Sequence, residues 1–136
     1  EANVWSCPSF NELHRDAMEV ERYNRLHPLE EAKVPFVAQQ LKGHEGPVVV
    51  ATDYIRSFAE RIRAYIPNDF HVLGTDGFGR SDSRANLRRF FEVDRYNVAV
   101  TALAALADEG KVSKETVQQA IEKYGIATDT APSWKR

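Results

Sequence analysis

Two short apolar runs, residues 47–53 (PVVVATD) and 70–76 (FHVLGTD), constrain the fold more than any other feature of the sequence. The first is a continuous β-branched run, which is typical of a strand buried on both faces of a sheet. A helix-like stretch separates the two runs, and this alternation predicts a mostly parallel sheet with helices on its faces. A shorter run at residues 3–7 (NVWSC) is expected to add a third strand.

Capping signals predict where helices begin in the first half of the chain. Ser9 and the glutamate three residues later have capping-box spacing, which predicts a helix through about residue 23. A short helix is expected around residues 35–41. Asp53 is a plausible N-cap for a longer helix over residues 54–66, which a proline then ends.

The second half carries similar signals. Asp82 or Ser83 is expected to start one helix, Asp94 a second and Ser113 a third, each followed by a helix-like stretch. The stretch 98–106 is apolar nearly all round, so its helix is expected to be deeply packed. The last ten residues show no periodicity and are expected to be either loose or docked on something that this chain lacks.

Composition is that of an ordinary globular protein. The 136 residues are 43% hydrophobic and 28% charged, and we expect them to form one domain over residues 1–136. A net charge of −2 gives no basic excess, so no nucleic-acid partner is expected. No apolar stretch reaches the roughly 20 residues of a membrane span, so no membrane partner is expected either. The single cysteine, Cys7, excludes an intrachain disulfide.

Residues 74–84 (GTDGFGRSDSR) look at first like a phosphate-binding loop. The spacing across Gly74–Ser81 fits one, and a predicted strand precedes it. However, Arg80 stands where such a loop has a lysine, and its planar fork does not act as a compact point charge. Asp76 and Asp82 would repel an anion. A phosphate-binding enzyme using Gly74–Ser81 therefore stays only as a minor alternative.

An interaction role explains the same loop better. Its glycines allow tight turning after a strand, and Phe78 would dock onto a neighbouring surface. The arginines that follow are expected to form salt bridges at an interface. The interface candidates are Asp76, Gly77, Phe78, Gly79, Arg80, Ser81, Arg84 and Arg88.

Three segments resemble a known family: ERYNRLHPLEEAKVPFVAQQL, VVVATDYIRSFAERIRAYIP and VLGTDGFGRSDSRANLRRFFEVD. They resemble the C-terminal domain of the homodimeric bacterial pyruvate dehydrogenase E1 component, and the resemblance covers residues 4–126. It implies an α/β fold of the transketolase C-terminal type, with three α/β/α layers and a mixed, mostly parallel sheet. In that family, thiamin diphosphate and Mg²⁺ bind in the two other domains of the full-length enzyme. No catalytic, cofactor-binding or metal-binding residue is therefore assigned to this chain.

The resemblance also implies a function. The full-length enzyme decarboxylates pyruvate and reductively acetylates the lipoyl groups of the E2 component, in the bacterial cytoplasm. This part would serve assembly, with the remaining E1 domains, the second E1 subunit of a homodimer and E2 as partners. Docking of the E2 subunit-binding domain is an alternative role, and other 2-oxo acids are alternative substrates. The family's domain begins with a further strand and helix, so this chain is expected to be an N-terminally truncated fragment without activity of its own.

Overall fold

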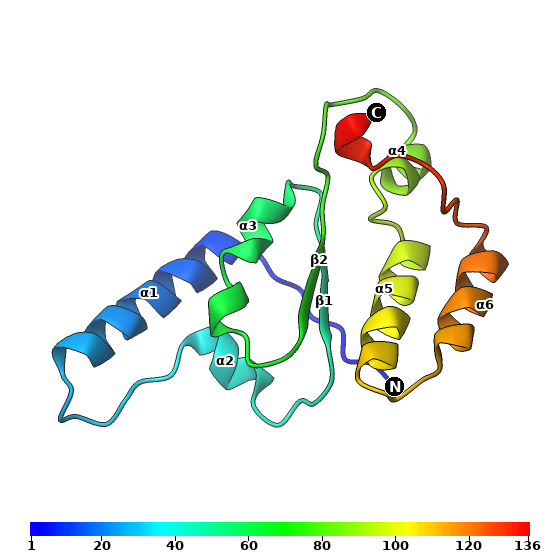
Figure 1. Cartoon of the computed structure of the whole chain (residues 1–136). Coiled ribbons are helices and arrows are strands. Elements are labelled where there is room, and N and C mark those ends of the chain that lie inside the picture. Colours follow the sequence, from blue (N-terminus) through cyan, green and yellow to red (C-terminus); the bar gives the residue numbers. More distant parts are fainter. The chain divides into compact units, whose positions relative to one another are not determined.

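The computed structural model describes all residues from 1 to 136, and they form two compact units (Figure 1). The first, here called the N-terminal unit, comprises Glu1–His44 and Phe58–Pro67. The second, here called the sheet unit, comprises Glu45–Ser57 and Asn68–Arg136. The prediction of a single domain stays a prediction.

The sheet unit is built on two parallel strands, β1 (Val48–Ala51) and β2 (Phe70–Leu73). Their register pairs Val48 with Phe70 and Ala51 with Leu73, so both strands end at the same edge. Helix α5 (Arg95–Asp108) packs against β1, and α6 (Lys114–Tyr124) packs against α5 (Figure 1). These elements confirm the α/β class and the parallel pairing, whereas the three-layer arrangement stays a prediction.

The predicted caps of the sheet unit are confirmed. The Ser83 hydroxyl accepts a hydrogen bond from the Asn86 amide and begins α4 (Arg84–Phe90). The Asp94 carboxylate accepts hydrogen bonds from two amides of the first turn of α5. Ser113 caps α6 in the same way, and that helix ends at Gly125 in the left-handed conformation, which glycine adopts without strain.

The N-terminal unit holds α1 (Phe10–Leu26) and α2 (Phe36–Leu41), which pack against each other. Ser9 caps α1 as predicted. The Asp16 carboxylate accepts a hydrogen bond of 2.7 Å from the backbone N–H of Phe36. The Asn24 side chain both donates to and accepts from the backbone of Lys33, so the connection between the helices is fastened to α1.

Two predicted elements are wrong. Residues 3–7 form no strand: the sheet pairs only β1 with β2, and Trp5 instead packs edge-on against His44. The helix predicted over residues 54–66 is also shorter and broken, with α3 (Arg56–Glu60) followed by a separate 3₁₀ turn, η1 (Arg63–Tyr65).

The late start of α3 has a clear cause. The backbone carbonyl of Tyr54 accepts a hydrogen bond from the Thr75 amide, and the carbonyl of Asp53 accepts one from the Thr75 hydroxyl. These bonds extend the pairing of the two strands past their ends, so the chain stays non-helical there. Asp53 consequently does not cap a helix, which corrects the prediction.

Burial is shallower than the sequence predicted. The three valines of β1 are half-buried rather than fully enclosed. Within the apolar stretch of α5, Ala105 alone is buried and the other residues from 98 to 106 are half-buried. The predicted deep packing of this stretch is therefore wrong in this chain, where β1 and α6 are the elements that pack extensively on α5.

Candidate interface loop

Residues 74–84 leave the sheet edge where both strands end, and their first residues are held there. Gly74 is buried, and a Cβ at this position would lie 2.8 Å from the Tyr54 carbonyl oxygen and 2.7 Å from the Arg56 side chain. Thr75 is bonded to the segment after β1 through both its amide and its hydroxyl. The loop therefore starts from a fixed position.

Asp76 is paired within the chain. Its carboxylate accepts hydrogen bonds from the Arg56 guanidinium Nε at 3.0 Å and from the Arg56 backbone N–H at 3.3 Å. Both side chains are partly exposed, so this ion pair contributes roughly 0–1 kcal/mol. This pairing holds the loop, and the role of Asp76 as an interface residue stays a prediction.

Gly77 lies against the backbone of Ser133 and Trp134, near the end of the chain. Its φ is +129°, and a Cβ there would come within 2.9 Å of the Ser133 carbonyl oxygen. The Ser133 hydroxyl in turn donates a hydrogen bond of 2.6 Å to the Asp76 carbonyl. Residues 131–136, here called the tail segment, therefore dock on the loop of this same chain. The prediction that the last ten residues are either loose or docked on something that the chain lacks is wrong for this segment. No cap, repeat or motif in the sequence pointed to Ser133.

The centre of the loop projects outward. Phe78 is 84% exposed, and no atom lies within 4 Å of the space where a Gly79 Cβ would be. Arg80 turns back, and its guanidinium lies 4.0 Å from the centre of the Phe90 ring in a cation–π contact. Ser81 is exposed and forms no hydrogen bond through its side chain. Phe78 is therefore the one large apolar side chain that the loop offers to a partner.

The last loop residues prepare α4. The Asp82 carboxylate accepts hydrogen bonds from the Asn86 side chain at 2.8 Å and from the Ser83 backbone N–H at 2.7 Å. The Asn86 hydrogen bond, followed by that of Ser83, lowers the pKa of Asp82 below its ordinary value because both favour the charged carboxylate. Arg84 is exposed at the first position of α4 and forms no ion pair.

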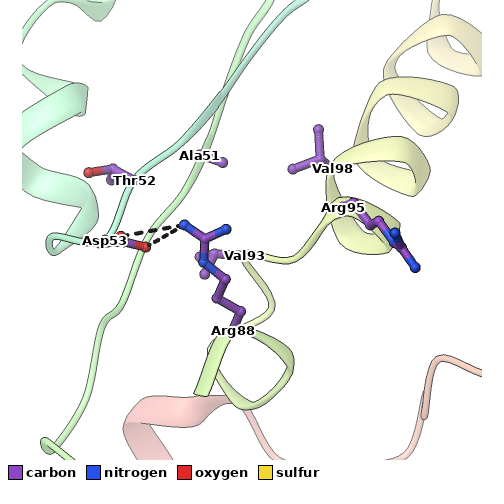
Figure 2. Close-up of a pocket in the computed structure, with 7 residues that line it drawn as sticks. All are labelled: Ala51, Thr52, Asp53, Arg88, Val93, Arg95 and Val98. Atoms are coloured by element: carbon purple, nitrogen blue, oxygen red, sulfur yellow. Dashed lines mark hydrogen bonds and ion pairs between the residues drawn. The ribbon is translucent and has the colours of Figure 1, made fainter. Parts of the chain in front are cut away.

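Arg88 lies at a shallow pocket of about 360 Å³ beside the loop (Figure 2). The pocket is lined by Ala51, Thr52, Asp53, Arg88, Val93, Arg95 and Val98. Figure 2 shows Arg88 directed toward Asp53, with N···O distances of 3.4 and 3.5 Å, whereas Arg95 points away from the pair. Arg88 is therefore paired within the chain, and its role as an interface residue stays a prediction.

The loop does not fit a phosphate or a metal ion. The space above Gly77, where a phosphate oxygen would have to lie, is filled by the backbone of the tail segment. Arg80 is engaged with Phe90 rather than directed into the loop. Nor do three His, Cys, Asp or Glu side chains converge anywhere in the chain as ligands of a metal ion would. Gly74 and Gly77 serve close approach of the chain to itself, which argues against the phosphate-binding alternative.

Comparison with known proteins supports the resemblance seen in the sequence. The chain is 55% identical over 126 residues to a protein of Cupriavidus necator and 56% identical over 126 residues to one of Pseudomonas aeruginosa. It is 51% identical over 129 residues to one of Escherichia coli K12. Each of the three is named pyruvate dehydrogenase E1 component, and the alignments cover 92–94% of this chain.

The chain spans about 14% of the length of each of these relatives. None of its helices combines the length and the apolar character that crossing a bilayer requires. The sequence profile of the family described as the transketolase-like TK C-terminal domain matches residues 1–94, which is more than half of the chain. The chain therefore belongs to the transketolase-like C-terminal domain family.

Proposed function

We propose that this chain is the C-terminal domain of a bacterial, cytoplasmic pyruvate dehydrogenase E1 component. The support is its identity of 51–56% to three proteins that carry this name, over nearly all of its length. The complete enzyme would decarboxylate pyruvate and transfer the acetyl group to lipoyl groups of E2. Thiamin diphosphate and Mg²⁺ would supply the decarboxylation chemistry from other domains of the complete enzyme.

Within that enzyme, the domain would serve assembly, and the 74–84 loop would contact another E1 domain or the second E1 subunit. The observation that carries this proposal is the 84% exposure of Phe78 on a loop whose two ends are both held in place. Burying a phenylalanine side chain is worth about 1.5–3 kcal/mol. Aromatic side chains, phenylalanine included, are also enriched at the cores of protein interfaces.

The proposal is tested by replacing Phe78 in the complete protein as its gene encodes it. We expect Phe78→Ala, alone and combined with Arg80→Ala, to weaken dimerisation by roughly ten- to a hundredfold, the factor that corresponds to the loss of one buried phenylalanine. Sedimentation velocity measures dimerisation, and pyruvate decarboxylation reports on the assembled active site. Leu29→Ala is the matched control, because Leu29 is fully exposed and lies in the N-terminal unit.

Unchanged dimerisation and unchanged decarboxylation in the Phe78→Ala, Arg80→Ala protein would contradict the assembly role. Unchanged dimerisation combined with weaker binding of the E2 subunit-binding domain would show that the loop is instead a docking site for E2. Calorimetry that measures binding of the E2 subunit-binding domain to each variant separates the two roles.

A further inference from the structure

The tail segment is anchored to the loop by an unusually enclosed serine. Residues Ser133–Lys135 form a short 3₁₀ turn, η2, which Pro132 precedes. Ser133 is 5% exposed and is the one buried polar residue of the chain. Its hydroxyl is satisfied by the Asp76 carbonyl, so the burial carries no unpaired group. A segment without helical or strand periodicity is thereby given a defined position.

Arg56 connects the tail segment to the loop a second time. Its guanidinium binds the Asp76 carboxylate and also lies 4.9 Å from the centre of the Trp134 ring. One side chain therefore contacts the loop through an ion pair and the tail segment through a cation–π contact. Without Trp134, the Arg56 side chain would be less constrained, and it would therefore hold Asp76 less firmly.

A third connection passes through the Phe90 ring on α4. Arg80 of the loop lies 4.0 Å from the ring centre, and Arg136 of the tail segment lies 4.6 Å from it. Arg136 also donates a hydrogen bond of 3.3 Å to the Phe90 carbonyl and lies 3.6 Å from a Glu92 carboxylate oxygen. Loop and tail segment thus share this aromatic ring as a common support.

We propose that Arg56 and the tail segment act as a clamp that positions the 74–84 loop and so presents Phe78 in a single conformation. Phe78 follows the anchored pair Asp76 and Gly77 and precedes Arg80, which is anchored on α4. Fixing both sides of an exposed anchor before binding removes the entropy that the loop would otherwise lose in the complex. The clamp rests on the proposed interface role for its purpose, but its existence can be tested separately.

The test uses Trp134→Ala and Trp134→Phe in the complete protein. Hydrogen exchange of peptides covering residues 74–84, measured by mass spectrometry, reports directly on whether the loop is held. We expect Trp134→Ala to speed exchange of the loop about two- to fivefold, the factor that corresponds to one exposed cation–π contact. Trp134→Phe keeps an aromatic ring over Arg56 and should restore most of the protection. Dimerisation should follow the same order.

Two controls make the result specific. Trp5→Ala removes a tryptophan of similar exposure, 54% against 51% for Trp134, from the other unit, and it should leave exchange of the loop unchanged. Trp134→Ala is also measured in a Phe78→Ala background, where a faster exchange cannot arise from a weakened interface. Ser133→Ala, which removes only one hydroxyl, serves as a second variant if Trp134→Ala does not fold.

The outcomes separate the two proposals. Unchanged exchange of the loop in Trp134→Ala and Ser133→Ala overturns the clamp, even if Phe78→Ala weakens assembly. Suppose that Phe78→Ala weakens dimerisation, whereas Trp134→Ala speeds exchange of the loop but leaves dimerisation unchanged. That result overturns the positioning role of the clamp. Faster exchange in a protein whose assembly is insensitive to Phe78→Ala supports the clamp and refutes the proposed interface.

Discussion

Replacing Gly77 with alanine should force the tail segment away from the 74–84 loop. The new Cβ would lie 2.9 Å from the Ser133 carbonyl oxygen, closer than such atoms approach in proteins, and 3.1 Å from its carbonyl carbon, which is tighter than most such contacts. Both contacts are with backbone, which cannot turn aside as the end of a flexible side chain can. The φ of +129° adds strain, because alanine avoids this conformation.

The magnitude follows from these two effects. An alanine held in a sparsely populated backbone region costs about 1–3 kcal/mol. Separating Ser133 from Asp76 loses one hydrogen bond, which contributes about 0.5–1.5 kcal/mol. The tail segment can undock instead of distorting, so the free energy that holds it in place sets the upper limit of the loss. The lower values of the two costs, about 1 and about 0.5 kcal/mol, add to about 1.5 kcal/mol. A loss of that size corresponds to roughly a tenfold change in the docking equilibrium.

Hydrogen exchange of residues 131–136 in the complete protein measures that equilibrium. We expect Gly77→Ala to speed hydrogen exchange of these residues about tenfold or more. The exchange rate of the fully undocked segment sets the upper limit of this increase. Gly79→Ala is the matched control, two residues away in the same loop, with open space around its Cβ and no positive φ. It should leave exchange unchanged. Equal exchange in the two variants would refute the reasoning that connects Gly77 to the tail segment.

Two further predictions concern the helix caps. Asp94→Ala removes a carboxylate that accepts hydrogen bonds at 2.9 and 3.1 Å from two amides of α5, and it should lower the stability of that helix by about 1 kcal/mol. Hydrogen exchange of the first turn checks this, with the exposed Asp129→Ala as control, and equal protection in both would contradict the cap. Asn86→Ala removes the main cause of the lowered pKa of Asp82 and should raise that pKa back toward its ordinary value of 3.8, as followed by the carboxyl chemical shift during acid titration. Because the pKa of Asp82 is lower in the folded chain than in the unfolded one, its stabilisation is present above pH 3.8 and is lost as pH falls through the folded pKa. An Asp82 titration in Asn86→Ala that is the same as in the unchanged protein would contradict this.

Local chemistry explains why the helix starts could be predicted. A cap is formed by residues two or three positions apart, so Ser9, Ser83, Asp94 and Ser113 carry their structural role in the nearby sequence. The two strands of the sheet were predictable for the same reason, since their β-branched and apolar runs are local features. All of these predictions hold in the structure.

The errors arise where contacts between distant residues decide the outcome. Residues 3–7 have the composition of a strand, but a strand needs a neighbour, and the sheet pairs β1 only with β2. The helix predicted from residue 54 starts late because Thr75 holds the Asp53 and Tyr54 carbonyls, 20 or more residues away in sequence. The sequence near either end of these contacts gives no sign of them.

The candidate loop shows the same division. Phe78 was predicted to dock onto a neighbouring surface, and the structure leaves its side chain 84% exposed, so that docking stays a prediction. The pairing of Asp76 with Arg56, and of Arg88 with Asp53, could not be predicted, because a charged residue near the surface has the same sequence signature whether its partner is internal or external. Two of the predicted interface charges are thus used within the chain.

The glycines of the loop show why its sequence suggested two functions at once. A phosphate loop needs glycines because a ligand must approach the backbone closely, and any other close approach produces the same requirement. Here the Tyr54 carbonyl and Arg56 approach Gly74, and the backbone of Ser133 approaches Gly77, while Gly79 has open space around it. What fills the space above a glycine therefore distinguishes a ligand cradle from a contact within the chain. In this loop the chain fills it itself, and the side chain left for a partner is Phe78.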